Sequence, residues 1–276
     1  MIIDFHTHTF PVKVADRTVR ALSEACGGMS YYSDGMIDGL LRNMNGAGVD
    51  VSVNLPVLTR PEQFDSVRRY ALGINGDEKI SGRIISFAGV HPGISDIEGA
   101  FDMLAADGFL GVKIHPDYQG RFIDDEGYVR ILSEAKRYGM IVVTHAGFDC
   151  AYVGQPIRCT PDRVLRLLDR IGGYDRLVLA HLGGIKCFPE VLSQIAGRCD
   201  VYLDTAHISE FIDADMAVDI IQRHGEDRIL FATDSPWDDP SEDIQFIRSL
   251  SLGQKIEDKI FFANAKKLLR IGESNG

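Results

Sequence analysis

The sequence predicts an α/β fold in which eight parallel strands and their helices form a single (β/α)8 TIM barrel over residues 1–276. Short apolar runs alternate with helix-like segments along the whole chain, as expected for consecutive βαβ units. The length of 276 residues suits one such barrel. An open doubly wound sheet usually has a glycine-rich phosphate-binding turn after its first strand. The first strand here ends in His6-Thr7-His8 instead.

Each predicted strand is a short apolar run that ends in polar, glycine or proline residues. The eight runs span residues 2–9, 49–57, 84–91, 111–115, 140–145, 177–181, 201–205 and 228–234. Helical segments are predicted at 36–45, 61–75, 97–106, 125–138, 161–171, 189–196, 213–224, 241–250 and 256–271. Proline at the start of the second of these helices and glycine after the fourth support those boundaries. The long connection at 11–48 contains a glycine- and tyrosine-rich part, 26–34, which we interpret as an insertion suited to a lid.

Composition narrows the class of protein. The formal net charge is 29 − 40 = −11, and no basic stripe is visible, which argues against a nucleic-acid partner. No apolar run approaches the ~18 residues that a membrane span needs, and no signal peptide is recognised. The five cysteines are scattered, with no Cys-x-x-Cys pair, so we expect reduced thiols and a cytoplasmic protein.

Polar side chains gather at the predicted strand ends, where the active site of a (β/α)8 barrel lies. Alternation along a strand places His6 and His8 on one face, and Lys113 and His115 on one face. Of the eight histidines, only His224 falls outside this set. The strand-end residues are His6, His8, His91, Lys113, His115, His145, His181, Asp204 or His207, and Asp234. Imidazole and carboxylate groups clustered in this way favour a divalent-metal site.

Motifs at these strand ends, taken in order, resemble the amidohydrolase superfamily. They are His-Thr-His at 6–8, Val-Thr-His-Ala-Gly at 143–147, Ala-His-Leu-Gly-Gly at 180–184, Ala-Thr-Asp-Ser-Pro at 232–236 and Asn-Ala-Lys-Lys-Leu-Leu at 264–269. The last is similar to a signature of the amidohydrolase-related branch. That branch includes aminocarboxymuconate-semialdehyde decarboxylase and related decarboxylases, hydratases and lactonases. The resemblance covers essentially the whole chain.

The resemblance implies that His6, His8, His145 and Asp234 bind one divalent ion, expected to be Zn²⁺. It also implies that His181 positions and activates a water molecule whose proton Asp234 accepts. Water bound to such an ion has a pKa near ~7. In binuclear members of the superfamily a carboxylated lysine on the fourth strand bridges two ions. Lys113 at that position would allow a second ion with His181 as its ligand, but we expect one ion and a Lys113 amine that holds a substrate carboxylate.

These features predict a metal-dependent hydrolase that uses metal-activated water on a small ester, lactone or amide. The alternative is a metal-dependent decarboxylase of a small unsaturated or aromatic carboxylic acid. An anionic-substrate pocket built from Arg60, Lys113 or His115 would favour that alternative. His91 and His115, which each precede a proline at a strand end, are further candidates for substrate contact or for a second metal ion.

Two other classes are less favoured. Residues 4–9 also resemble the opening of PHP-type phosphoesterases, but residues 51–55 lack the Thr-Asp-His-like motif that usually follows there. A scaffold without chemistry is disfavoured because every ligand position is filled. We therefore expect a small-molecule substrate and no nucleic-acid or membrane partner, and we leave open whether identical chains form an oligomer.

Overall fold

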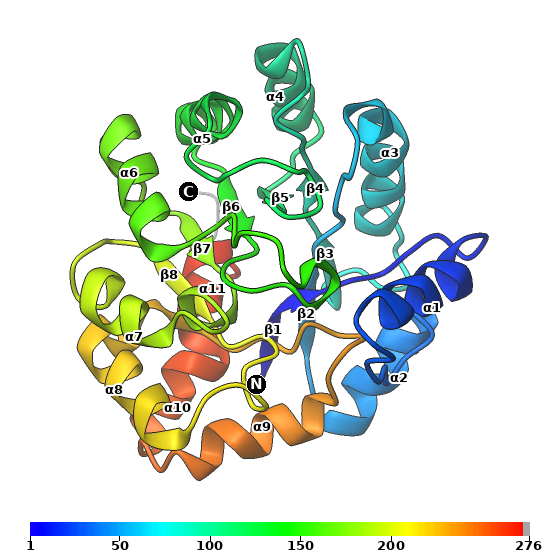
Figure 1. The fold of residues 1–276 in the computed structure, drawn as a ribbon. Helices are drawn as coiled ribbons and strands as arrows, with labels where there is room; N and C mark the ends of the chain where they lie inside the picture. Colours follow the sequence, from blue (N-terminus) through cyan, green and yellow to red (C-terminus); the bar gives the residue numbers. More distant parts are fainter. Residues whose placement is uncertain (273–276) are drawn as a thin grey trace.

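The computed structural model describes residues 1–272 and shows parallel strands surrounded by helices (Figure 1). The strands are β1 (Ile3–Thr7), β2 (Val51–Asn54), β3 (Ile84–Ser86), β4 (Ala88–Gly89), β5 (Gly111–Ile114), β6 (Ile141–Thr144), β7 (Leu177–Leu179), β8 (Tyr202–Asp204) and β9 (Ile229–Leu230). β3 and β4 are two parts of one predicted strand, which is interrupted at Phe87. All eight predicted strands are therefore present.

The strands pair in parallel in the order of the chain. One ladder runs β1-β2-β3, and in the other the strands from β4 to β9 lie side by side in chain order. The first strand also meets the end of the last, because Phe5 N donates to Phe231 O at 2.9 Å and Asp234 N donates to His6 O at 2.8 Å. The fold is the predicted (β/α)8 barrel. The single domain predicted over 1–276 stays a prediction, and its residues 273–276 lie outside the described part.

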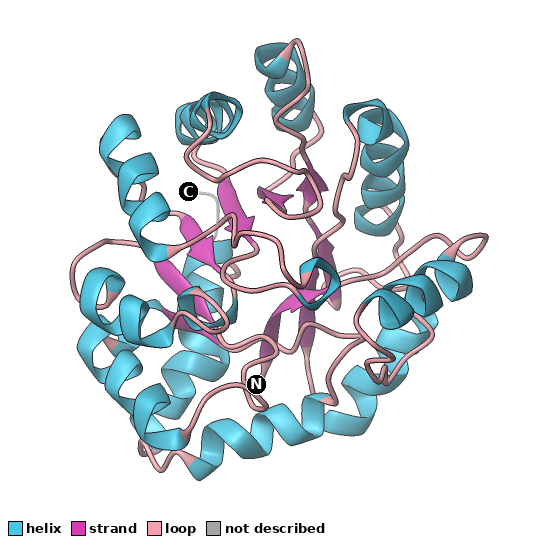
Figure 2. Cartoon of the chain, viewed as in Figure 1, coloured by secondary structure: helices cyan, strands magenta, loops and turns pink. Residues whose placement is uncertain are grey.

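The helices lie mostly around the outside of the strands (Figure 2), whereas the last of them packs against the inner strand residues. They are α1 (Ala15–Ala25), α2 (Ile37–Ala47), α3 (Phe64–Asn75), α4 (Ile97–Ala106), α5 (Glu126–Tyr138), α6 (Pro161–Ile171), α7 (Phe188–Glu190), α8 (Ala214–His224), α9 (Pro240–Ser249), α10 (Gln254–Asp258) and α11 (Asn264–Leu269). α7 continues as a π-helical turn at Val191–Ile195, and a second such turn at Lys259–Ala263 joins α10 to α11. The predicted helix at 256–271 is therefore present as a continuous helical segment over 254–269 that contains one π-helical turn.

Helix α1 was not predicted. It lies near the start of the long connection at 11–48, before the part 26–34 that we interpreted as an insertion, and only the later helix at 36–45 was predicted there. Its buried face is a narrow stripe of Ala15, Val19 and Ser23, and no side chain caps its N-terminus. The usual sequence signs of a helix start are therefore missing. Of its apolar side chains, Leu22 lines the cavity described below.

Apolar side chains form a large core between the strands and the helices. A second cluster joins strand residues such as Phe5, Val143 and Val178 to Leu268 and Leu269 of α11. This packing fixes the strands as a rigid base. The loops at their carboxyl ends are left to build the site.

The expectation of reduced thiols throughout was wrong for one pair. Cys26, directly after α1, forms a disulfide with Cys150, which follows β6, and their Cα atoms are 4.8 Å apart. The two cysteines are 124 residues apart in sequence, so only the folded barrel brings them together. Cys159, Cys187 and Cys199 are free. The cysteines consequently no longer support the prediction that the protein resides in a reducing compartment.

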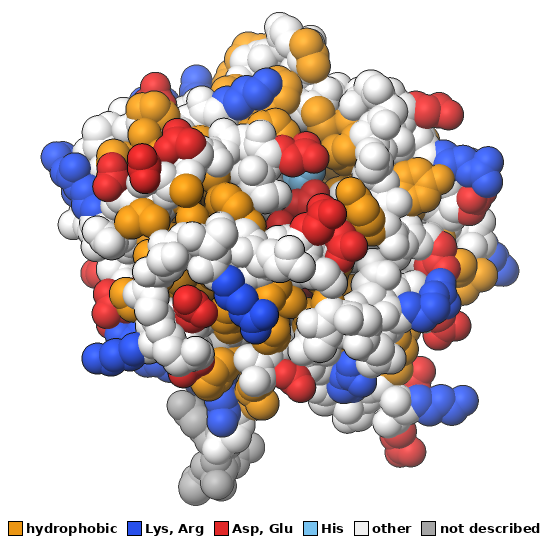
Figure 3. All heavy atoms as spheres, turned by 90° about the horizontal axis from the view of Figure 1, so that it is seen from below, with side chains coloured by type: hydrophobic (Ala, Val, Ile, Leu, Met, Phe, Trp, Pro, Cys, Tyr) orange, Lys and Arg blue, Asp and Glu red, His pale blue; other side chains and the backbone are white. Residues whose placement is uncertain are grey.

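Two surface features bear on partners. Within residues 1–272, no helix has both the length and the apolar character needed to cross a membrane. On the face seen in Figure 3, acidic and basic side chains are interspersed with apolar ones. Basic side chains do not gather into a stripe on that face.

Candidate active site

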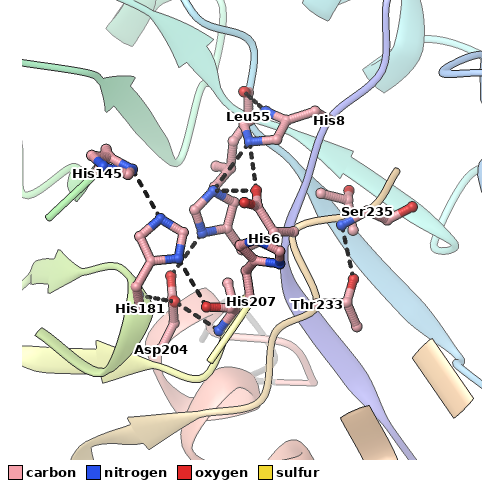
Figure 4. Close-up of polar contacts among 12 residues, drawn as sticks. His6, His8, Leu55, His145, His181, Asp204, His207, Thr233 and Ser235 are labelled. Carbon is pink, nitrogen blue, oxygen red and sulfur yellow. Dashed lines mark hydrogen bonds and ion pairs between the residues drawn. The ribbon is translucent and has the colours of Figure 1, made fainter. Parts of the chain in front are cut away.

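Three of the four predicted metal ligands converge where β1 meets the segment after β9 (Figure 4). Backbone hydrogen bonds hold these two segments together, including one from His8 N to Ser235 O at 2.6 Å. The Nε2 atoms of His6 and His8 are consequently 3.2 Å apart. Asp234 Oδ1 lies 3.3 Å from Nε2 of His6 and 3.0 Å from Nε2 of His8. These side chains form one compact group of potential ligand atoms.

The proton positions on both imidazoles follow from what their other ring nitrogens face. Nδ1 of His6 is 2.9 Å from Asp204 Oδ2, and Nδ1 of His8 is 2.7 Å from the Leu55 carbonyl oxygen. Because both oxygens accept, each Nδ1 carries the proton and donates it. Each Nε2 is then a bare lone pair. Two lone pairs and the Asp234 carboxylate thus face one another, an arrangement that a cation would satisfy.

The spacing of these atoms fits a divalent ion. Imidazole nitrogen and carboxylate oxygen bind zinc at about 2.0–2.2 Å, so neighbouring ligands of one ion lie about 3.0–3.5 Å apart. The observed separations of 3.0, 3.2 and 3.3 Å are within this range. Imidazole and carboxylate donors suit several divalent metals. The residues present therefore fit a divalent metal ion.

Lys113 supplies a positive charge beside this group. Its Nζ donates to Nε2 of His6 at 2.8 Å, and the side chain is 1% exposed. Burial lowers the pKa of Lys113 to about 8, although Asp234 and Asp204 act in the opposite direction. The lysine on the fourth predicted strand thus points to the site, as alternation predicted.

His145, the fourth predicted ligand, lies beside His181 rather than among the first three. Its Nδ1 is 2.9 Å from Nε2 of His181, and Nδ1 of His181 is 2.8 Å from the Ala206 carbonyl oxygen. The carbonyl fixes a proton on Nδ1 of His181, so His145 is the donor between the two rings. Nε2 of His145 is left as a buried lone pair without a hydrogen-bond partner in the described structure. Such an atom is costly unless something binds it.

A second group of potential ligands contains His115, His145 and Asp149. The rings of His115 and His145 stack with centroids 4.3 Å apart. Nδ1 of His115 accepts from Tyr118 N at 3.4 Å, so its Nε2 carries the proton and faces Asp149 Oδ2 at 3.4 Å. Burial raises the pKa of Asp149 to about 6. Because this group already contains a proton donor, it lacks the clear demand for a cation that the first group has.

Burial sets the charge states of the site. It lowers the pKa of His6 to about 4, with a further contribution from Lys113. It also holds the pKa of His115 and of His145 well below the usual value. Burial alone would raise the pKa of Asp234, but neighbouring histidines outweigh it and keep this pKa well below its usual range. Neutral imidazoles and an ionised carboxylate are the states that bind metal.

Two buried aspartates fix the histidines of the site through hydrogen bonds. Besides facing the His6 ring, Asp204 accepts from His181 N at 2.9 Å. It therefore fixes two strand ends at once. Asp4 accepts from His6 N at 3.2 Å and from the Thr233 hydroxyl at 2.7 Å. The sequence named Asp204 as an alternative to His207 and left its role open, because that role depends on strand register.

The two groups of potential metal ligands, Lys113 and His181 all line one cavity of about 540 Å³, within the usual range for small-molecule sites. Its inner end is polar, whereas its walls are mostly apolar and aromatic. The apolar lining comprises Phe10, Pro11, Val14, Leu22, Met29, Pro56, Val57, Val67, Phe148, Ile185, Phe211 and Trp237. Several of these belong to α1 and its flanks, so the predicted insertion forms part of the wall. Cys26 and Cys150 also line the cavity.

Of the four residues predicted to contact substrate, the structure places two in the cavity and two outside it. Lys113 and His115 line the cavity, whereas His91 and Arg60 are not among its lining residues. Nδ1 of His91 accepts from Gly93 N at 2.9 Å in a local turn. Arg60 lies on the exposed surface before α3. Proximity in sequence to a strand end was therefore too weak a signal for these two residues.

Comparison with solved structures shows the same fold over the whole chain. A 5-carboxyvanillate decarboxylase from Novosphingobium aromaticivorans, complexed with manganese and 4-hydroxy-3-methoxy-5-nitrobenzoic acid, has a TM-score of 0.73 at 15% identity, covering 98% of this chain and 96% of the other. A dihydroxybenzoic acid decarboxylase from Polaromonas sp. JS666, with manganese and the inhibitor 2-nitroresorcinol, has a TM-score of 0.71 at 16% identity, with coverages of 98% and 96%.

A 2,6-dihydroxybenzoate decarboxylase from Rhizobium has a TM-score of 0.69 at 18% identity, covering 98% of each chain. A search of curated proteins finds no match. The Amidohydrolase family model matches residues 3–271, which confirms the resemblance inferred from the strand-end motifs. The chain is a metal-dependent enzyme with a divalent-metal site, and it belongs to the amidohydrolase family.

Proposed function

We propose that the protein is a metal-dependent decarboxylase of a small aromatic carboxylic acid. The observation that carries the proposal is the division of the cavity into two parts. The inner end holds His6, His8, Asp234 and the amine of Lys113, while the walls are largely apolar and aromatic. A flat apolar ring with one carboxylate matches this division.

The apolar walls suit the charge change of decarboxylation. A carboxylate is strongly stabilised by water, whereas the departing CO₂ is neutral, so a water-poor site favours the reaction. Phe148, Phe211 and Trp237 can pack against an aromatic ring. Hydrolysis, in contrast, needs a water molecule delivered to the reacting carbon and polar groups for two products.

The sequence predicted hydrolysis first and decarboxylation as the alternative. We now prefer the alternative. The three similar structures described above are all decarboxylases of aromatic acids, which supports this choice. At 15–18% identity they establish the fold only, so the cavity must carry the argument for the reaction.

The residues at the inner end have separable tasks in this proposal. The bound ion would supply a Lewis acid that orients and polarises the acid group. His6, His8 and Asp234 hold it, and His145 joins them through its unpaired Nε2. Lys113 cannot donate to Nε2 of His6 while that lone pair is in use, so its amine is free to pair with the substrate carboxylate.

Decarboxylation breaks one carbon–carbon bond and forms one carbon–hydrogen bond, so a proton must reach the ring carbon. We assign this transfer to Asp234, which takes the proton from a substrate hydroxyl or from solvent and delivers it as CO₂ leaves. His181 is held by the Ala206 carbonyl oxygen and by Asp204, which accepts from its backbone. It is positioned to support the neighbouring His145.

The identity of the metal also belongs to the proposal. Zn²⁺ was expected from the sequence, whereas two of the similar structures hold manganese. The donor set suits both ions, and Zn²⁺ generally binds such sites more tightly than Mn²⁺. We expect both ions to bind. Activity measured with each ion will show which one supports the reaction.

The test is a decarboxylation assay on metal-free protein reconstituted with Mn²⁺ or Zn²⁺. 2,6-Dihydroxybenzoate and 5-carboxyvanillate are suitable substrates, with CO₂ release and loss of substrate absorbance as readouts. In D₂O the product should carry one deuterium at the carbon that lost the carboxylate. The His8→Ala variant, which lacks a ligand, is the control and should be inactive. Turnover of a lactone such as dihydrocoumarin without any CO₂ release from the acids would instead restore the hydrolase prediction.

A further inference from the structure

We propose that His207, held by Asp238, is a substrate-binding residue that donates a hydrogen bond to a hydroxyl or phenolate oxygen on the aromatic ring. This inference rests on the proposed function and narrows its substrate class to hydroxylated aromatic acids. It concerns a part of the cavity outside the proposed metal ligands.

The two side chains form a tight buried pair. Nδ1 of His207 lies 2.6 Å from Asp238 Oδ1, and both residues are less than a tenth exposed. The carboxylate accepts, so Nδ1 is the donor and the ring orientation is fixed. Asp238 lies four residues after Asp234, in the loop that leads to α9, whereas His207 follows β8. The pair thus joins two strand ends of the barrel.

The other ring nitrogen of His207 is free to bind a ligand. In the described structure Nε2 of His207 has no protein hydrogen-bond partner, while the side chain lines the cavity together with Phe211 and Trp237. The ring of Phe211 packs edge-on against the imidazole, with centroids 5.3 Å apart. An aromatic ligand between these groups would therefore place its substituents within reach of Nε2.

The backbone at His207 is held in an uncommon conformation. Its φ is 53°, in the left-handed region that side chains other than glycine rarely adopt. His181 and Asp234, two other cavity residues, have φ values of 59° and 63°. Such conformations cluster at functional sites. The same conformation also occurs outside the cavity lining, at Lys186, Ser251 and Arg270. The position of His207 in the cavity therefore carries the inference.

Charge makes the pair suited to an oxygen that gains electron density. Burial lowers the pKa of His207, but the hydrogen bond and charge of Asp238 outweigh it, and the net shift is upward. The protonated ring offers an N–H from Nε2 to the cavity. In the proposed function Lys113, on β5, pairs with the substrate carboxylate. His207, on another strand end, offers a second donor in the same cavity for a ring oxygen.

Asp238 acts through His207 as a positioning residue. It does not line the cavity, and among the described residues its side chain hydrogen-bonds to His207 alone. Removal of its charge should therefore matter only while the imidazole is present. A double-mutant cycle can detect this dependence.

The experiment uses the metal-loaded full chain and two probes, 2,6-dihydroxybenzoate and benzoate, which differ only in the hydroxyl groups. Binding can be followed through the fluorescence of Trp237, since the chain has one tryptophan and it lines the cavity. The quantity measured is the ratio of the two dissociation constants. The variants are His207→Leu, His207→Gln, Asp238→Asn and the double variant, with His224→Gln as a control at a buried histidine outside the cavity lining.

We expect the wild-type protein to prefer 2,6-dihydroxybenzoate, and His207→Leu to reduce that preference about tenfold or more, as loss of a hydrogen bond from a charged donor does. His207→Gln should retain part of the preference, and His224→Gln all of it. Asp238→Asn should reduce the ratio in the wild-type background and leave it unchanged beside His207→Leu.

The outcomes separate this inference from the proposed function. If both probes bind and neither His207 variant changes the ratio, the inference is overturned while the decarboxylase proposal stands. If Asp238→Asn changes the ratio equally with and without the imidazole, its assigned role is wrong. If neither probe binds the metal-loaded protein, the proposed function fails and the inference fails with it.

Discussion

The Asp204→Asn variant should bind metal 10- to 100-fold more weakly than the wild-type protein, although Asp204 is not a metal ligand. Its carboxylate fixes the proton on Nδ1 of His6 at 2.9 Å and accepts from His181 N at 2.9 Å and Ala206 N at 3.1 Å through its other oxygen. In the variant the amide oxygen would keep the two backbone donors, since an amide nitrogen cannot accept them. The amide nitrogen would then face Nδ1 of His6.

Two donors cannot face each other, so the proton of His6 would move from Nδ1 to Nε2. A protonated Nε2 cannot bind a metal. Loss of a partner that orients a metal-binding histidine typically lowers metal affinity 10- to 100-fold, which corresponds to about 1.4–2.7 kcal/mol. The burial of Asp204, which is 0% exposed, places the expected effect toward the upper part of that range.

Mn²⁺ affinity can be measured by competition with a chromogenic chelator, with thermal unfolding as a check on folding. Asp4→Asn is the matched control. Asp4 is equally buried and lies near the site, but it contacts the His6 backbone and Thr233 rather than an imidazole ring. We expect the control to change affinity much less. A folded Asp204→Asn protein with wild-type affinity would refute the argument from proton position.

Further predictions concern charge and stability. Lys113→Met should raise the KM for an aromatic acid about tenfold or more through loss of a charged hydrogen bond without lowering metal content; lost metal would indicate a bridging carboxylated lysine. Cys150→Ser should lower the free energy of unfolding by up to ~4–5 kcal/mol, because the disulfide closes a long loop. Calorimetry should show this as a lower unfolding temperature, whereas Cys199→Ser should leave the unfolding temperature unchanged. Burial, assisted by Asp238, raises the pKa of Asp243 to about 10. The folded protein then keeps a proton that the unfolded chain releases, so stability falls as pH rises from about 4 to 10, by at most about 1.4 kcal/mol per pH unit. Asp243→Asn should flatten this slope in urea unfolding at pH 5 and 8, and an unchanged slope would contradict the assignment.

Much of the fold could be predicted because its signals are local. Apolar runs and their polar ends located all eight strands, and proline or glycine marked several helix ends. Helix α1 could not be found because its buried stripe of Ala15, Val19 and Ser23 is narrow and no side chain caps its start. The Cys26–Cys150 bond was missed because partners 124 residues apart are chosen by the tertiary fold.

The site was predicted in part for a similar reason. Barrel topology placed His6, His8 and Asp234 among the polar residues at the strand ends, and the resemblance to the amidohydrolase superfamily singled them out, with His145, as metal ligands. Roles that depend on ring orientation, such as the pairing of His145 with His181, need atomic positions. Asp238 was not singled out, although it lies four residues from Asp234, because nothing in one sequence shows that it faces His207.

The most direct test of the central claim is anomalous scattering from crystals of the Mn²⁺-reconstituted protein. We predict one peak per chain, bonded to Nε2 of His6, Nε2 of His8, Nε2 of His145 and Asp234 Oδ1. A peak at the group formed by His115 and Asp149, or two peaks bridged by Lys113, would contradict the account.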